Sequence, residues 1–428
     1  MNNSYTSQDN HLDSAKNLDQ KEKINLRSEF HFPGNESKHE TLYFCGHSLG
    51  LMPKDARKAI DTELNSWEKY GVEGHFNGPY PWLPYHENIT KSFAHLVGAQ
   101  ENEVVAMNTL TTNLHLMLVS FYRPSQKRYK ILIEKNTFPS DKYAVDSQAR
   151  FHGFDAHDAI VELKTDVNDK VVSQEYLLEQ IAELGDELAL VMLGNCNYLS
   201  GQAFDIKAVT EKAHSVGAMC GFNLAHGAGN LALNLHDDGA DFAVWCSYKY
   251  LNAGPGGIAG AFVHERHLGL KDIPRFEGWW GNNKDNRFEM RPEFDPLQTV
   301  EAWSLSNPPI FQLASLRASM NLFDQAGMKN LREKGDRLTA YLEYVLKENC
   351  GENLEIVTPS YHPEKQMRGS MLCVKIKNAD TQAMFKKFQA RGIIIDFREP
   401  DILRMCPAPL YNNFEDCYRL AQAIKESF

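Results

Sequence analysis

Short apolar runs alternate with amphipathic helical patterns from about residue 55 to residue 310, and this alternation constrains the fold most strongly. The runs that read as buried strands are YKILIEK (129–135), LALVMLGN (188–195), AMCGFNL (218–224), DFAVWCS (241–247) and AGAFVHE (259–265). Between them, EYLLEQIAELG and DIKAVTEKAHSVG place apolar residues at helical spacing, and each ends at a glycine. Strands that alternate with helices are joined by parallel crossovers. The sequence therefore predicts an α/β fold whose mostly parallel sheet is flanked by helices on both faces.

A change of pattern near residue 310 indicates a second, smaller domain. Residues 311–349 are almost continuously helical, and they are followed by MLCVKIK, a helix TQAMFKKFQARG, the strand GIIIDFRE and a last helix from Phe414. This order predicts a large domain over residues 76–310 and a small α+β domain over residues 311–428. Residues 26–75 are expected to contribute to the small domain, and the polar residues 1–25 to form a mobile tail.

Composition narrows the class of protein. Of the 428 residues, 43% are hydrophobic and the net charge is −11, with basic residues scattered along the chain. This balance argues against nucleic acid or an anionic membrane as the main partner, and no apolar run approaches the roughly 20 residues that span a bilayer. The N-terminus carries no apolar signal segment. The eight cysteines form no CxxC pair, which predicts reduced thiols in a cytoplasmic protein and no metal site.

Lys249 directly follows the predicted strand DFAVWCS, where burying an ammonium is costly. Such a lysine is either a solvated loop residue or an amine held in a pocket to form a Schiff base. The glycines of NAGPGG that follow it allow close backbone approach, or simply form a turn before the next strand.

Three other predicted strand ends carry polar or aromatic groups, and ligands of open α/β sheets bind at the carboxyl ends of strands. The turn NTLTTN places Thr111 at a helix N-terminus, which suits either a phosphate or simple capping. NTFPSD supplies Phe138, a stacking ring or a core residue, and Asp141. GFNLAHG places Asn223 and His226 at the end of its strand, where both could face one cleft. With Lys249, these groups describe a site for pyridoxal phosphate.

The chain also resembles the kynureninases, pyridoxal-phosphate enzymes of the aspartate-aminotransferase fold family (fold type I), from about Leu42 to the C-terminus. The resemblance rests on YFCGHSLGLMP, YKILIE, FPSD, LAHGAGN, CSYKYLNAGPGGIAGAFVHE, EGWWG, LSNPPI and APLYN. It implies hydrolysis of L-kynurenine or 3-hydroxy-L-kynurenine to L-alanine and anthranilate or 3-hydroxyanthranilate, in tryptophan catabolism or NAD biosynthesis. Cysteine desulfurases and aminotransferases of this fold would not need the SNPPI and EGWWG segments.

The resemblance also implies residue roles. Lys249 would hold the cofactor as a Schiff base and then act as base at Cα, with Tyr248 contacting the phosphate and relaying protons. The remaining cofactor-binding residues would be Leu110, Thr111, Phe138, Asp141, Asn223, His226, Trp279 and Asn307. The substrate would contact Ser48, His75 and Asn307, and its α-carboxylate would pair with Arg404. Trp279 and Asn307 would come from a second subunit, which implies a homodimer with shared active sites.

The chain departs from the family pattern at three positions. Asn223 stands where relatives of this fold nearly always carry the Asp that keeps the pyridine nitrogen protonated. His47 replaces the Asn of GNSLGL, and Asn282 replaces the His of WGH, which suggests an exchanged pair that shares a hydrogen bond. For Asn223, three interpretations compete: Asp141 alone protonates the nitrogen, the ring stays neutral and the reaction changes, or the protein is a catalytically weak relative. The presence of the other site residues favours the first.

Overall fold

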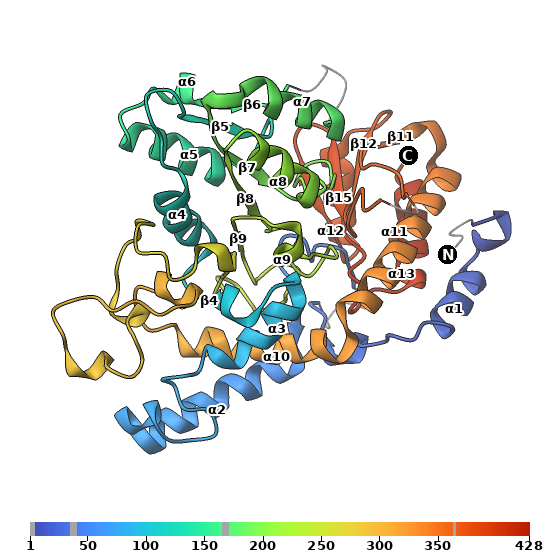
Figure 1. The fold of residues 1–428 in the computed structure, drawn as a ribbon. Helices are drawn as coiled ribbons and strands as arrows, with labels where there is room; N and C mark the ends of the chain where they lie inside the picture. The colour runs from blue at the N-terminus through green and yellow to red at the C-terminus, as the bar shows by residue number, and fades with distance from the viewer. Residues whose placement is uncertain (1–4, 35–40, 165–170, 363–364) are drawn as a thin grey trace.

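The computed structural model describes residues 5–34, 41–164, 171–362 and 365–428, and the large domain is built on a seven-stranded sheet (Figure 1). In spatial order the strands are β4 (Val104–Ala106), β10 (Gly260–Val263), β9 (Phe242–Trp245), β8 (Met219–Asn223), β7 (Leu188–Gly194), β5 (Lys130–Ile133) and β6 (Ile160–Glu162). Neighbouring strands run parallel except at β10, which is antiparallel to both β9 and β4. The predicted α/β fold with a mostly parallel sheet is confirmed.

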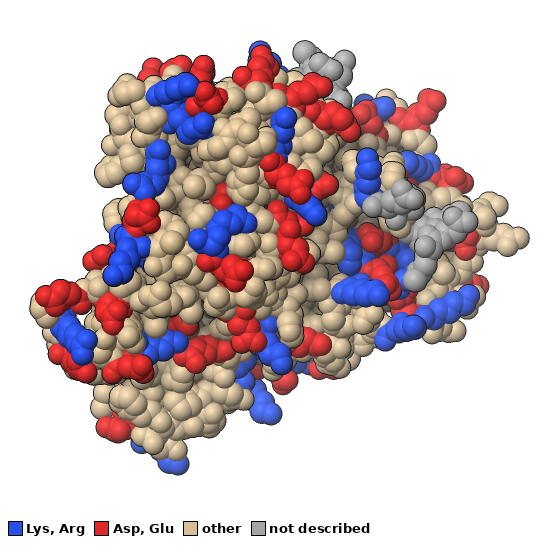
Figure 2. Space-filling model, viewed as in Figure 1, with Lys and Arg blue, Asp and Glu red and all other residues tan. Residues whose placement is uncertain are grey.

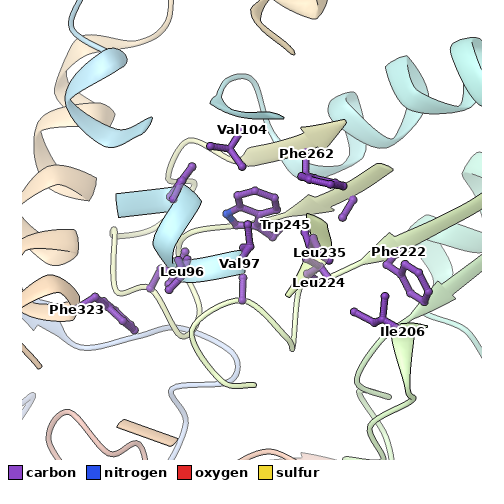
Figure 3. Packing of buried hydrophobic residues seen from close by; sticks show 14 of the residues in the cluster. Leu96, Val97, Val104, Ile206, Phe222, Leu224, Leu235, Trp245, Phe262 and Phe323 are labelled. Atoms are coloured by element: carbon purple, nitrogen blue, oxygen red, sulfur yellow. The ribbon is translucent and has the colours of Figure 1, made fainter. Parts of the chain in front are cut away.

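Both faces of this sheet are buried, as the unbroken apolar runs predict. Along β9, Ala243 and Trp245 belong to one hydrophobic cluster, and Phe242 and Val244 belong to the cluster on the opposite face. This is the period-two alternation of a strand. Figure 3 shows part of the first cluster, in which Trp245 lies beside α3.

Helices cover the two faces, and those at 174–184 and 206–215 lie where the sequence pattern predicts them. The covering helices are α3 (Glu87–Val97), α4 (Leu110–Phe121), α5 (Pro139–Phe151), α6 (Ala156–Ala159), α7 (Gln174–Leu184), α8 (Ile206–Ser215) and α9 (Leu235–Asp238). The side chains of α3, α7 and α8 belong to the Trp245 cluster, and those of α4 and α5 to the opposite one.

The small domain follows two long helices, α10 (Ile310–Ala326) and α11 (Met328–Cys350), which meet at Gly327 with φ +74°. Its antiparallel sheet has the order β11 (Leu354–Ile356), β12 (Leu372–Ile376), β15 (Ile402–Met405) and β14 (Asp396–Arg398). The remaining elements are α12 (Thr381–Ala390), β13 (Ile393–Ile394) and α13 (Phe414–Lys425). The predicted strand and helix at 371–390 and the last helix from Phe414 are all present.

The N-terminal residues differ from the predicted mobile tail. Helix α1 (Leu12–Gln20) packs beside α13 (Figure 1). The Asp19 carboxylate accepts hydrogen bonds from the backbone N–H groups of Phe414 and Glu415, at 2.7 and 3.0 Å. These are orphan donors at the start of α13, so the carboxylate caps a helix that is distant in sequence. The prediction of a mobile tail is therefore wrong for residues 5–25, and residues 1–4 lie outside the described residues.

Residues 26–75 divide between the two domains. Strand β2 (Leu42–Tyr43) pairs in parallel with β13 of the small domain, and Phe44 enters the small-domain core. Strand β1 (Phe30–His31) pairs instead with β3 (Met52–Pro53), and α2 (Lys54–Tyr70) packs along α10. The segment therefore contributes to the small domain only in part.

The surface carries both signs of charge. Acidic and basic side chains are interspersed over the face shown in Figure 2. Within the described ranges, no helix combines the length and apolarity needed to cross a membrane.

Candidate active site

A pocket lies at the carboxyl ends of β5, β7, β8 and β9, where the sequence predicted the site. Its lining includes most of the predicted cofactor-binding residues: Leu110, Thr111, Phe138, Asp141, Asn223, His226, Tyr248 and Lys249. They come from segments that span 140 positions of the chain and meet only because the parallel strands end at one edge of the sheet.

Lys249 presents its amine inside this pocket. Its Nζ lies 3.3 Å from Nε2 of His226, and Nδ1 of that histidine lies 3.2 Å from the Tyr250 hydroxyl. Burial lowers the pKa of Lys249 and also lowers the pKa of His226. Burial therefore makes the Lys249 amine easier to deprotonate, and the neutral amine is the form that acts as a nucleophile or base.

Asp141 and Asn223 form a buried pair in the same pocket. The Nδ2 of Asn223 donates to Oδ2 of Asp141 at 2.7 Å, and its Oδ1 accepts from the backbone N–H of Ala225 at 2.8 Å. Oδ1 of Asp141 is buried and has no hydrogen-bond partner in the described chain. Burial raises the pKa of Asp141 to about 6. A buried carboxylate with an unused acceptor atom fits a cationic N–H donor such as a protonated pyridine nitrogen.

The first turn of α4 supplies the predicted phosphate end. Leu110 and Thr111 begin this 12-residue helix, and Oγ1 of Thr111 lies 2.8 Å from Oγ of Ser140. A helix N-terminus has unpaired N–H groups and a positive dipole end, which together suit a phosphate. Phe138 lines the pocket and is 45% exposed, so its side chain is accessible for stacking. These residues and the Asp141 oxygen fit the predicted cofactor.

The pocket residues that the sequence analysis missed include Glu134 and Tyr198. Glu134 directly follows β5, and its carboxylate accepts from Nδ2 of Asn197 at 2.6 Å and from the backbone N–H of Gly194 at 3.1 Å. Burial raises its pKa to about 7. Tyr198 packs its ring edge-on against Phe138, with the centroids 5.4 Å apart. Glu134 could have been predicted as a site residue, because it is a charged residue near the end of the predicted strand YKILIEK.

Arg404 lies on β15 of the small domain and contacts a residue that lines the pocket. It is only 2% exposed, and its Nη1 donates to the carbonyl oxygen of the pocket residue Tyr198 at 2.6 Å. Its Nε donates to Oδ2 of Asp396 at 2.6 Å. The structure thus brings the predicted carboxylate-binding arginine toward Lys249, and it adds an acidic partner that the sequence analysis did not identify.

The other predicted site residues lie outside the pocket of the single chain. His75 and Asn307 line a separate hollow of about 400 Å³ with the aromatic residues Trp67, Trp82 and Phe311. Trp279 is 44% exposed and lines a third hollow. Ser48 lies in a turn in which its backbone N–H donates to the carbonyl of Cys45 at 2.9 Å.

The suggested hydrogen bond between His47 and Asn282 is not formed within the chain. The His47 ring is buried, and its Nε2 lies 3.6 Å from Oδ2 of Asp396. Oδ1 of Asn282 instead accepts from the backbone N–H of Asp295 at 2.7 Å. Burial lowers the pKa of His47 to about 4, so the ring is neutral near pH 7. The prediction of a shared hydrogen bond is wrong for a single subunit.

Glu103, His236 and His264 form an acid–histidine cluster in which the potential ligand atoms lie within 4.8 Å of one another. The sequence predicted no metal site. Oε1 of Glu103 already accepts from the backbone N–H of Glu265 at 2.7 Å, and Nδ1 of His264 accepts from the N–H of Arg266 at 3.2 Å. These lone pairs are used within the chain, so the cluster is a hydrogen-bond network.

Solved structures with this fold include enzymes that act on sulfur amino acids. A complex of the cystine C-S lyase C-DES with its product cysteine persulfide matches with a TM-score of 0.75 at 16% identity, covering 92% of this chain and 99% of that one. A mutant of C-DES with glycine covalently linked to its PLP cofactor also gives 0.75, covering 93% and 98%. Cysteine desulfurase from Thermococcus onnurineus gives 0.74 at 16% identity, covering 94% and 96%. These similarities show the fold.

Sequence relatives are much closer. The family model for the kynureninase C-terminal domain matches residues 331–424. Kynureninase from Myxococcus xanthus is 54% identical over 412 residues, covering 96% of both chains. Kynureninases from Koribacter versatilis and Christiangramia forsetii are 48% and 46% identical, covering 93% and 98% of both chains. The chain belongs to the kynureninase family.

Proposed function

We propose that this protein is a pyridoxal-phosphate-dependent C–C bond hydrolase that cleaves the Cβ–Cγ bond of L-kynurenine, 3-hydroxy-L-kynurenine or both. The products would be L-alanine and anthranilate or 3-hydroxyanthranilate. Near-full-length identity to kynureninases supports this proposal. The observation that carries it is the pocket that is lined by the half-buried Lys249 and by Asp141, whose buried Oδ1 has no hydrogen-bond partner in the described chain.

The chain offers a partner for each part of the cofactor. Lys249 would hold it covalently, Leu110 and Thr111 would hold its phosphate with Tyr248, and Phe138 would stack on its ring. Asp141 would accept a hydrogen bond from the ring nitrogen. When bound, pyridoxal phosphate supplies an electron sink for the charge released at the substrate Cα.

Lys249 and Tyr248 would move the protons. A neutral amine accepts a proton from Cα, and burial lowers the pKa of Lys249 toward the range in which a base works best. Burial raises the pKa of Tyr248 to about 12, so its phenol keeps its proton near pH 7 and can donate it. His226, 3.3 Å from the amine and uncharged because burial lowers its pKa, would orient the lysine without repelling it.

The substrate would bind between two subunits of a homodimer. Arg404 would pair with its α-carboxylate, and Ser48, His75 and Asn307 would contact its aromatic ring. His75, Asn307 and Trp279 lie in hollows outside the pocket of their own chain, beside exposed aromatic side chains such as Trp67 at 59%. A partner subunit would bring the Trp279 and Asn307 of one chain to the pocket of the other.

A second candidate function follows from Asn223. A neutral amide cannot hold a pyridine nitrogen protonated by charge, so the protein could instead be a kynureninase-like enzyme with altered or weak activity. The 2.7 Å hydrogen bond from Asn223 to Asp141 supports the main proposal, because it orients and stabilises the carboxylate that remains. We further propose a cytoplasmic enzyme of tryptophan catabolism or NAD biosynthesis.

The test combines turnover with covalent trapping. Purified protein with added cofactor is assayed with both substrates by anthranilate or 3-hydroxyanthranilate fluorescence, and a second sample is reduced with borohydride and mapped by peptide mass spectrometry. We expect product formation and a reduced cofactor adduct on Lys249, absent from a Lys249→Ala control. An adduct without product would favour the Asn223 alternative, and no adduct on Lys249 would refute both.

A further inference from the structure

Two groups hold the Arg404 side chain: the Asp396 carboxylate on the neighbouring strand and the Tyr198 carbonyl oxygen, which is distant in sequence. Arg404 lies directly opposite Asp396 across the β14–β15 pair. Its Nε donates to Oδ2 of Asp396 at 2.6 Å, and its Nη2 also contacts this oxygen. Its Nη1 donates to the carbonyl oxygen of Tyr198 at 2.6 Å, in the segment that lines the pocket.

This arrangement leaves part of the guanidinium for a ligand. A guanidinium has five N–H donors in a plane, one on Nε and two on each Nη. Asp396 takes the edge formed by Nε and Nη2, and Tyr198 takes one donor of Nη1. One N–H on each Nη remains without a partner in the described chain, and a carboxylate has two oxygens that can accept from such donors.

The charges around Asp396 also suit an incoming anion. Nε of Arg398 lies 3.3 Å from Oδ2 of Asp396, so two guanidinium groups face one carboxylate. Two further titratable neighbours add no charge near pH 7: burial raises the pKa of the Cys45 thiol to about 12, and burial of His47, 3.6 Å from Asp396, keeps its ring neutral. The group Arg398, Asp396 and Arg404 therefore carries one net positive charge, which a single carboxylate neutralises.

We propose that Asp396 is a positioning residue for recognition of the substrate α-carboxylate: it fixes Arg404 by its Nε–Nη2 edge and leaves the two outer N–H groups to the substrate. This inference rests on the proposed function, in which Arg404 binds that carboxylate. Without Asp396, the guanidinium rotates about its side-chain bonds, and Arg404 and Arg398 repel each other.

The test uses two amines that differ only in the carboxylate, L-alanine and ethylamine, added to the holoenzyme and followed by the absorbance change of the bound cofactor. In Asp396→Asn we expect the Kd for L-alanine to rise about tenfold, equivalent to about 1.4 kcal/mol, and the Kd for ethylamine to change less than about twofold. The KM for L-kynurenine should rise by a similar factor with kcat within about threefold. Asp396→Glu should recover part of the L-alanine affinity.

Asp401→Asn is the matched control, because Asp401 pairs with Lys375 at 3.2 Å in the same domain and should leave both affinities unchanged. Equal weakening of both amines in Asp396→Asn, or no weakening of either, overturns the inference and leaves the proposed function standing. If Asp396→Asn loses affinity for L-alanine but not for ethylamine, and the wild-type protein does not turn over kynurenine, the inference is supported and the proposed function is refuted. A wild-type protein with no bound-cofactor absorbance refutes both.

Discussion

Asp141→Asn should make the cofactor-free protein more stable while it damages the active site. Burial raises the pKa of Asp141 from its ordinary 3.8 to about 6, so the folded chain holds the proton more tightly than the unfolded chain. The folded state therefore loses stability as the pH rises from about 4 through about 6. At about 1.4 kcal/mol for each pH unit between the two pKa values, the full cost near pH 7.5 is about 3 kcal/mol.

The asparagine variant removes this cost and keeps the shape of the side chain. Its Oδ1 can still accept from Nδ2 of Asn223, and its Nδ2 replaces an oxygen that is itself unpaired. We therefore expect the cofactor-free variant to gain up to about 3 kcal/mol at pH 7.5 and roughly half of that at pH 5. Kynurenine turnover of the holoenzyme should fall by on the order of a hundredfold or more, because no carboxylate is left at the pyridine nitrogen.

Reversible urea unfolding of the cofactor-free proteins at the two pH values measures the effect. Asp146→Asn is the control on the same helix, where the Asp146 side chain is 19% exposed and forms an i,i+4 ion pair with Lys142. It should change the free energy of unfolding by less than about 0.5 kcal/mol. An Asp141→Asn protein that is no more stable than the parent at pH 7.5, or whose gain is the same at both pH values, would refute the reasoning.

Two further substitutions test the site and the core. Asn223→Asp replaces the amide that donates to Asp141 at 2.7 Å with a second carboxylate. The two carboxylates should share one proton near pH 7, so we expect turnover not to rise. A tenfold or larger rise in the anthranilate fluorescence assay would show that the native pyridine ring is under-protonated. Gly260→Ala would put a Cβ 2.2 Å from the buried Trp245 ring. It should cost about 1–3 kcal/mol in urea unfolding, and an unchanged stability would contradict the packing described for β9 and β10.

Much of the large domain was predictable because its signals are local. The strands β7 to β10 coincide with apolar runs that the sequence shows directly, and the carboxyl-end rule placed Lys249, Asp141 and Asn223 in one pocket. The antiparallel direction of β10 was not predictable, since the glycine-rich segment 253–257 can turn the chain without a helical crossover and leaves no distinct pattern. The docking of α1 was missed because its capping carboxylate, Asp19, serves a helix almost 400 residues away.

The sequence by itself determined the fold class, the catalytic lysine candidate and the family, because periodicity and long motifs are written in consecutive residues. Only the tertiary structure decided which groups complete the site. The pairing of Arg404 with Asp396, the contact of Glu134 with Asn197 and the unpaired oxygen of Asp141 all arise between separate strands and loops. Hydrogen bonds and burial depend on distances in space, and those distances are set by how the sheets pack.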